Sequence, residues 1–412
     1  MQLAPQIERS VEQGVTAPKK STRPHIYELD IVRALTAVLV ITVHVLFFTK
    51  VFSTRLSFLL PQYALLTLAH ARAVFAFVTA FALVYVYAGK PFSGRTFWKK
   101  RSLGILLPYC FWTCIYVWVN WHPATLEAFT WTSLRSMLLG DASYQLYFIL
   151  LTIQFYIIFP LFLWFVQKVK NHPWLVLSIS FAIQMIVLYV DYSYVQPGGK
   201  WNLSGLWSQI ASYHDRYIIL YEFYFVMGGF AALYQTQIRA FLTRYGKSII
   251  ALMVVACAIT VLHFYIQIMV GHESYARATN FLQPIVGVYD AVLTIFICYG
   301  AYLLASKKRA DGKPRGYKGW QLLSNATFGV YLIHALFISL TMNYSYLIPQ
   351  AWPAQLRVLT LWSTVVVCSY ISSIVLMKIP VISRLVGRKQ AFPNMSSLFS
   401  KELATRESLS KQ

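Results

Sequence analysis

The sequence predicts an all-α polytopic membrane protein, a bundle of about ten transmembrane helices. Hydrophobic residues make up 58% of the 412 positions and charged residues only 12%, against about 25% charge in soluble domains. Apolar runs recur along the chain, each close to the roughly 20 residues that a membrane-spanning helix needs. Aromatic residues make up 17%, and disordered chains are poor in them. An ordinary soluble enzyme and a disordered chain are both excluded.

The apolar runs give the predicted elements in chain order. A polar segment at 1–27, without the apolar core of a signal peptide, is expected to be a disordered tail. A single membrane domain at 28–377 follows, and a basic tail at 378–412 closes the chain. The ten predicted spans are 31–49, 66–88, 102–120, 144–166, 173–190, 215–235, 248–270, 280–305, 322–341 and 357–377. The second has the least certain start, because 57–65 is apolar too.

Charge predicts how the bundle lies in the membrane. The net charge of +22 would indicate nucleic-acid binding in a soluble protein. Here basic loops on the cytoplasmic side explain it better, and no nucleic-acid partner is expected. With ten spans, 27 Lys and Arg residues lie on the side of the two termini and seven on the other. This asymmetry predicts that both termini are cytoplasmic. The five cysteines lie in apolar runs without metal-binding spacing, so neither disulfides nor a metal site is expected.

Arg33 and His44 are the first candidates for chemistry. They are eleven residues apart in the first predicted span, which is about three helical turns and roughly 16 Å of rise, so their side chains share one face. Arg33 is placed near the cytoplasmic edge and His44 near the middle of the bilayer. An ionisable group there is costly and is a functional candidate. The structural alternative is a histidine that only hydrogen-bonds between helices.

Other ionisable groups fall at a similar depth, counting about 1.5 Å per residue from the cytoplasmic edge. They are Glu222, His263, Asp290 and His334. A carboxylate beside a histidine orients the ring and raises its basicity. Either Glu222 or Asp290 could therefore assist His44, and the sequence leaves open which one does. Each could equally be a polar tie between helices.

A basic cluster lies at the expected cytoplasmic edge of the third span. Lys100 and Arg101 are its central members, and Arg101 falls at the depth of Arg33. Several cations at one edge suit a phosphate-rich ligand, because guanidinium binds phosphate through two parallel hydrogen bonds. Ordinary loop charge is the alternative, and it weighs more for Lys100 than for Arg101. Asp30, three residues before Arg33, could orient that arginine.

Two further cations lie in the second predicted span. His70 and Arg72 are placed near the outer leaflet. They could meet a polar substrate that arrives from outside, or they could extend to the outer headgroups. No phosphate-binding loop, metalloprotease motif or serine-nucleophile motif is present.

In this order and spacing, the motifs resemble those of the acyltransferase-3 family, integral membrane proteins that acylate cell-surface polysaccharides. The family's Arg-x10-His signature matches Arg33 to His44. The other matches, over about residues 28–340, are the basic motif at Lys100, Arg101 and Pro108, the fourth-span pattern at Leu146, Tyr147, Phe148, Tyr156 and Pro160, and the late motif from Ser324 through Tyr331 to His334. The second-span SGF block is only loosely matched by Thr79-Ala80-Phe81, and Gly104 stands where a second arginine is usual. These departures leave the acyl group open between acetyl and another such as succinyl.

The resemblance implies a membrane-bound O-acyltransferase at 28–377 in a bacterial cell membrane, a stand-alone member without an esterase-like domain. Acyl-CoA, with acetyl-CoA expected, would be the co-substrate, and no cofactor would be bound. The acceptor would be a hydroxyl of a cell-surface polysaccharide or of its lipid-linked precursor.

The expected roles follow from this reaction. His44 would be the general base, and a covalent acyl-His44 intermediate is a less supported variant. Catalytic candidates are His44, Arg33, Glu222 and Asp290; acyl-CoA-binding candidates are Arg33, Arg101, Lys100 and Asp30; acceptor contacts or polar ties in the bundle are Arg72, His70, Tyr331 and His334.

The sequence allows three other interpretations. An exporter of polysaccharide or lipid-linked sugar would also contain buried ionisable residues, although the halves of such transporters are commonly repeated. A structural partner of a glycan synthase would use His44 only for packing. His25 and Asp30 match the His-x4-Asp pattern of soluble lipid acyltransferases, but with nine His and 14 acids such a match arises by chance, and it is discounted.

Overall fold

The computed structural model describes residues 23–197, 199–310 and 312–387. In this part of the chain, nine helical segments are long and apolar enough to cross a membrane. A shorter apolar segment, Ile218–Leu233, lies among them. The prediction of an all-α polytopic membrane bundle is therefore confirmed, with nine long segments and one short one in place of ten similar spans. Of the two predicted tails, residues 1–22 and 388–412 lie outside the described residues.

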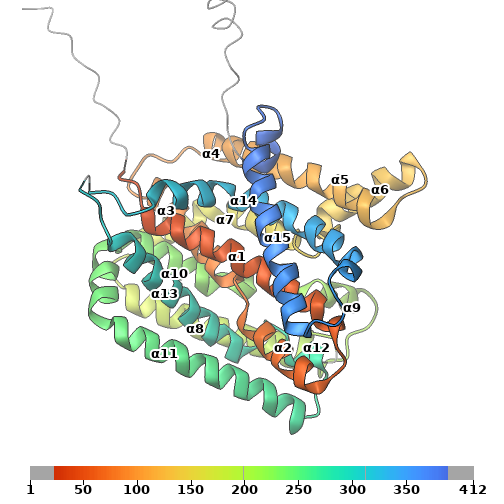
Figure 1. Cartoon of the computed structure of the whole chain (residues 1–412). Coiled ribbons are helices and arrows are strands. Elements are labelled where there is room, and N and C mark those ends of the chain that lie inside the picture. Colours follow the sequence, from red (N-terminus) through yellow and green to blue (C-terminus); the bar gives the residue numbers. More distant parts are fainter. Residues whose placement is uncertain (1–22, 198, 311, 388–412) are drawn as a thin grey trace, which may run out of the picture.

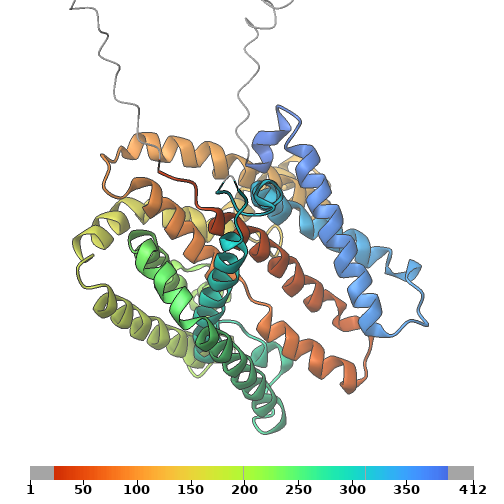
Figure 2. The same ribbon diagram turned by 60° about the vertical axis from the view of Figure 1, so that its left-hand side comes forward.

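The helices lie side by side in one bundle (Figures 1 and 2). Short π-helical turns join α4 to α5 at Ser102–Leu106 and extend α8 at Asp191–Val195. The α-helices are α1 (Tyr27–Thr49), α2 (Leu56–Leu68), α3 (Arg72–Tyr87), α4 (Gly94–Arg101), α5 (Leu107–Trp121), α6 (Leu126–Leu139), α7 (Tyr147–Lys168), α8 (Pro173–Val190), α9 (Gly205–Ser212), α10 (Glu222–Leu233), α11 (Gln235–Met269), α12 (Tyr275–Ala278), α13 (Pro284–Ser306), α14 (Tyr317–Asn343) and α15 (Ala354–Leu376).

The two ends of α1 define the two ends of the bundle. We call the end at Tyr27 the near end and the end at Thr49 the far end. Tyr27 packs edge-on against Tyr317 at the start of α14, with ring centroids 5.9 Å apart. The last described turn, Ile382–Val386, also lies at the near end (Figure 1). The described chain thus begins and ends on one side, as an even number of crossings requires.

The second span was predicted as one helix over 66–88, and this prediction is wrong. The structure divides it into α2 and α3, separated by Ala69, His70 and Ala71, and α2 takes in the apolar run at 57–65. Irregular backbone at membrane depth is tolerated only where protein or a polar cavity surrounds it. The three residues of the break are buried, between 2% and 6% exposed. The Tyr289 hydroxyl donates to the carbonyl of Leu68 at 2.8 Å and so satisfies one of the acceptors that the end of α2 leaves open.

The short segment Ile218–Leu233 depends on its neighbours. Gln184 of α8 donates to the carbonyl of Leu220 at 2.7 Å and accepts from the backbone N–H of Phe223 at 3.2 Å. At Gly228, a Cβ atom would lie 2.2 Å from the carbonyl oxygen of Phe77 in α3. Only glycine allows the two backbones to approach this closely. This contact fixes α3, and with it Arg72 at the first residue of that helix, against α10.

Candidate active site

His44 lies in a box of aromatic rings toward the far end of α1. Its imidazole stacks on that of His334 in α14, with centroids 5.4 Å apart and planes 26° apart. The ring of Tyr144, from the connection between α6 and α7, lies 4.5 Å from His44 and 6.4 Å from His334. Phe48, one turn beyond His44, closes the box against Tyr144 at 5.1 Å. Depth counting placed His44 and His334 in one layer, and the structure brings them together.

Three polar atoms of this box are buried without a hydrogen-bond partner among the described residues. They are Nε2 of His334, the hydroxyl of Tyr144 and the side-chain nitrogen of Gln145. His44 itself makes no hydrogen bond or ion pair in the described chain. Buried polar groups in proteins are nearly always satisfied, and an unsatisfied one in a membrane bundle costs more still. Such a cluster is typical of a site whose partners arrive with a substrate.

The box is rigidly built around α14. The Tyr331 hydroxyl donates to the backbone carbonyl of Gln145. The Tyr116 hydroxyl of α5 donates to the carbonyl of Leu332 at 2.5 Å. His334 is 0% exposed, and its Nδ1 lies 3.2 Å from the carbonyl of Val330. Tyr331, expected as an acceptor contact or a polar tie, is thus a tie in this structure.

Neither predicted carboxylate contacts His44. Glu222 accepts from the hydroxyl of Ser180 in α8 at 2.8 Å. Asp290 of α13 is 7% exposed, and its Oδ1 has no hydrogen-bond partner in the described chain. His263, at a similar predicted depth, pairs with Gln283 at 3.1 Å. A carboxylate that orients His44 therefore does not emerge from these contacts.

A second polar group lies at the break between α2 and α3. Arg72 Nη2 is 3.3 Å from His70 Nδ1, and His70 Nε2 is buried without a partner in the described chain. The Arg72 guanidinium lies over the ring of Phe281 and 6.0 Å from that of Tyr147. The Arg72 side chain is therefore turned into the protein and does not extend to headgroups.

The charges of this group act on the imidazole of His44. Arg72 and His70 both interact electrostatically with the imidazole of His44, and Arg72 interacts with Asp290 as well. A cation close to the candidate base is placed to stabilise negative charge that develops there.

The near end of the bundle holds two arginines that have no acidic partner within ion-pair distance in the described chain. Arg33 makes no hydrogen bond or ion pair there, and its electrostatic neighbours include Arg101 and Tyr156. The Arg101 guanidinium lies 5.3 Å from the ring of Tyr156, and its Nε is buried without a partner. Lys100 is exposed. Two partly buried guanidinium groups whose charges act on each other are well suited to hold phosphate.

Asp30 has a different partner from the one expected. Its Oδ1 accepts from the hydroxyl of Ser324 in α14 at 2.8 Å. Its Oδ2 lies 2.5 Å from Nε2 of His25. The carboxylate therefore joins α1 to α14, and the discounted pair His25–Asp30 is a real contact. Asp30 influences Arg33 through its charge and makes no hydrogen bond to it.

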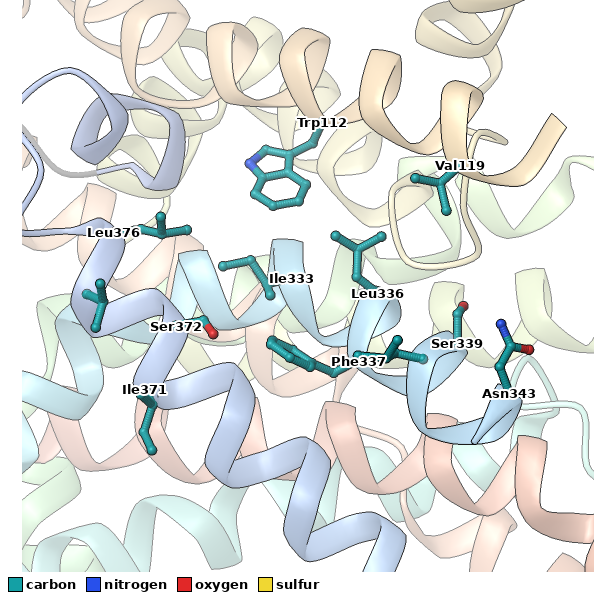
Figure 3. A pocket seen from close by; sticks show the side chains of 12 residues that line it. Trp112, Val119, Ile333, Leu336, Phe337, Ser339, Asn343, Ile371, Ser372 and Leu376 are labelled. Carbon is teal, nitrogen blue, oxygen red and sulfur yellow. The ribbon is translucent and has the colours of Figure 1, made fainter. Parts of the chain in front are cut away.

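A wide apolar groove lies on the other side of α14, between α5 and α15 (Figure 3). Its volume is about 660 Å³. Ile333, the neighbour of His334 in sequence, points into it together with Trp112 and Leu336. The groove contains no acidic or basic side chain, so it is separate from the chemistry around His44.

Sequence reasoning missed three participants. Tyr144 and Gln145 precede α7 in an irregular connection, where no helical periodicity points to them. Ser324 stands in the late motif but was given no role. The predicted span 144–166 included Tyr144 and Gln145 but gave neither a role, and the resemblance reached Leu146 and Ser324.

The sequence profile of the family described as "Acyltransferase domain", acyltransferase-3, matches residues 26–377. No curated protein and no solved structure matches the chain significantly. The matched residues include every helix from α1 to α15. They also include both residue groups described above, the box around His44 and the arginines at the near end. The chain therefore belongs to the acyltransferase-3 family of membrane acyltransferases.

Proposed function

We propose that this membrane acyltransferase moves an acyl group, acetyl in the first instance, from acyl-CoA to a hydroxyl of a cell-surface glycan or of its lipid-linked precursor. The observation that carries the proposal is the pairing of two sites along α1. A base without a hydrogen-bond partner, His44, lies about 16 Å along the helix axis from Arg33, which has no ion-pair partner in the described chain.

A donor with a phosphate group at one end and a long flexible chain that carries the acyl group at the other fits the separation between Arg33 and His44. The phosphates of acyl-CoA would bind Arg33 and Arg101 at the near end. The extended phosphopantetheine chain, which is of comparable length, would carry the thioester toward His44. At this distance Arg33 cannot polarise the thioester carbonyl, so its role is to bind the donor.

The transfer step needs one base and one stabilising cation. His44 takes the proton of the acceptor hydroxyl while the hydroxyl oxygen attacks the thioester carbon. Arg72 stabilises the oxyanion of the tetrahedral intermediate. The carbon–sulfur bond then breaks, and the protonated His44 returns its proton to the leaving thiolate, so that an ester and free CoA are formed. His334 holds the His44 ring by stacking.

The near end is assigned to the cytoplasm of the cell. With ten crossings, the sequence divides its Lys and Arg residues, those at span ends included, into 27 on the side of the two termini and seven on the other. This is the distribution of a bundle with both termini inside. Acyl-CoA would then enter from the cytoplasm, and the acceptor would reach His44 from the far, outer end. The bundle lies in the cell membrane.

The test is acyl-CoA turnover by the purified, lipid-reconstituted protein. Mass spectrometry would follow free CoA formed from acetyl-CoA and from succinyl-CoA in the native protein and in His44→Ala and Arg33→Ala. Turnover that disappears in His44→Ala while acyl-CoA still binds supports the proposal. Absence of acyl-CoA binding and turnover in the native protein would overturn it and would favour a glycan exporter.

A further inference from the structure

Connections at the far end of the bundle form a second concave surface, which we call the far-end groove. It lies between α6, α7, α9 and the turn His214–Arg216 and has a volume of about 700 Å³. Its polar and aromatic lining residues are Arg135, Gln154, Gln209, Ser212, Tyr213, Arg216 and Tyr217. Leucine and isoleucine side chains form the rest of the lining. The far-end groove is thus at the opposite end of the bundle from Arg33 and Arg101.

The floor of the far-end groove is fixed by hydrogen bonds. Gln154 of α7 donates to the carbonyl of Arg216 at 2.8 Å and accepts from the backbone N–H of Ile218 at 3.4 Å. The Tyr217 hydroxyl donates to the carbonyl of Ile210 at 3.0 Å. A loop pinned in this way to a membrane helix is a preformed surface, and preformed sites lose less entropy when a ligand binds.

Arg216 has donors that nothing in the described chain uses. Its Nε and Nη1 are buried and have no hydrogen-bond partner, although the side chain as a whole is 16% exposed. The nearest carboxylate oxygen, Oδ1 of Asp215, lies 3.9 Å from Nε, which is too far for a hydrogen bond. The guanidinium lies 4.3 Å from the ring of Tyr213. It is therefore held in place with free donors, which a ligand with oxygen acceptors would satisfy.

The far-end groove is joined to the box around His44. The Tyr213 hydroxyl donates to Oδ2 of Asp141 at 3.5 Å, and Asp141 lies three residues before Tyr144, whose ring contacts His44. On the other side, the Tyr221 hydroxyl donates to the carbonyl of Asp215 at 3.1 Å. Tyr221 is in turn an electrostatic neighbour of Arg72. The connection through Asp141 and Tyr144 thus leads from the groove to the ring of His44, and the second connection reaches Arg72, whose charge acts on His44.

The charges of the far-end groove are balanced. Arg135 lies 3.8 Å from Asp141 and Arg216 lies 3.9 Å from Asp215, so each cation has an acid beside it. A polyanion would be repelled by both carboxylates. Tyrosine rings, an amide and a guanidinium suit instead a ligand that combines apolar ring faces with many hydroxyl groups.

We propose that the far-end groove is the acceptor site, and that it binds a short segment of an uncharged, hydroxyl-rich oligosaccharide. The proposal rests on the proposed acyltransferase function and adds to it the place and the chemical class of the acceptor. Arg216 donates to sugar oxygens, and Tyr213 and Tyr217 contact the sugar rings. The bound segment presents one hydroxyl toward His44 past Tyr144.

Binding of defined oligosaccharides tests this without acyl-CoA. Maltopentaose, cellopentaose and chitopentaose are the uncharged probes, and pentagalacturonate is the charged one. Binding to the reconstituted full chain would be measured by saturation-transfer NMR and titration, for the native protein, Arg216→Leu and Gln209→Ala. Arg277→Leu is the matched control, because Arg277 is 20% exposed and also has a buried, unpartnered nitrogen but does not line the far-end groove.

We expect at least one uncharged pentasaccharide to bind the native protein, with affinity reduced about tenfold or more in Arg216→Leu and unchanged in Arg277→Leu. Gln209→Ala, a change at an exposed position, should weaken binding too and keeps the test valid if Arg216→Leu does not fold. The proposal is overturned if no uncharged probe binds, if pentagalacturonate binds best, or if the groove variants that fold bind as the native protein does. Acyl-CoA turnover is measured in a separate assay, so that a failure of the acyltransferase proposal can be told apart from a failure of the acceptor-site proposal.

Discussion

The imidazole rings of His44 and His334 stack face to face, 5.4 Å between centroids, across the contact between α1 and α14. Stacking fixes the plane of the His44 ring and leaves its edge nitrogens open to a substrate. Among the described residues, no carboxylate contacts His44. Ring contacts from His334 and Tyr144 therefore position the candidate base, a role that was expected of a carboxylate from the sequence.

His44→Ala should reduce acyl transfer by about 10²–10⁴-fold, the usual contribution of a general base, while the protein stays folded. His334→Ala should also slow transfer, because it releases the His44 ring. If the two act as one unit, the double variant is no slower than His44→Ala alone. Initial rates of the four proteins measure this, and losses that multiply in the double variant would contradict the positioning role of His334.

Arg33→Ala should raise the KM for acyl-CoA by about 10–100-fold, the range for a lost charge-assisted hydrogen bond, with kcat little changed. Equilibrium binding of acetyl-CoA and of its 3′-dephospho form would show which phosphate is held, because the variant should no longer distinguish the two if Arg33 binds the 3′-phosphate. The matched control is Lys99→Ala, an exposed cation at the same end. An equal loss of acyl-CoA affinity in Lys99→Ala would show that overall positive charge at this end, and not Arg33 itself, binds the donor.

Asp30→Asn should lower thermal stability, because Asp30 is 5% exposed and joins His25 to Ser324. Loss of a buried charged acceptor costs about 1–3 kcal/mol, which corresponds to a fall of several degrees in Tm. Glu28→Gln is the control: its partner Arg239 is 52% exposed, and such surface pairs contribute about 0–1 kcal/mol. Melting curves in one lipid mixture would compare them, and equal Tm values would argue against the joining role of Asp30.

Gly228→Ala should prevent α3 and α10 from packing, since the new Cβ would lie 2.2 Å from the carbonyl oxygen of Phe77. We expect a large loss of folded, monodisperse protein in size-exclusion chromatography. Gly300→Ala in α13 is the control, because its Cβ would meet no atom within 4 Å, and the change should stabilise that helix by up to about 1 kcal/mol. Normal yield of Gly228→Ala would contradict the close approach of the two helices.

Helix geometry and hydropathy were enough to predict most of the fold. Counting along the spans placed His44 and His334 in one layer, because the rise per residue is nearly constant. The count could not tell which helices are neighbours, and Glu222, expected near His44, bonds to Ser180 of α8 in the structure. Lateral position depends on packing between helices, which one sequence does not reveal.

The break between α2 and α3 shows a second limit. Ala69, His70 and Ala71 contain neither glycine nor proline, and the apolar run continues on both sides of His70 and Arg72. The break is stabilised from outside the segment, by burial and by the Tyr289 hydroxyl on the carbonyl of Leu68. Tyr144 was missed for a similar reason, since its contact with His44 arises only when the α6–α7 connection folds back on α1.

The divided second crossing also has a consequence for biosynthesis. α2 has 13 residues and α3 has 16, about 20 and 24 Å of helix, and each is shorter than a hydrocarbon layer of about 30 Å. The tyrosine that satisfies the end of α2 is translated 221 residues after Leu68. When this segment leaves the ribosome, α1 is the only one of its final helical neighbours that has been made. The α2–α3 segment therefore reaches its final arrangement only after α10 and α13 have been inserted. The second crossing of the chain is thus completed by helices that are made much later.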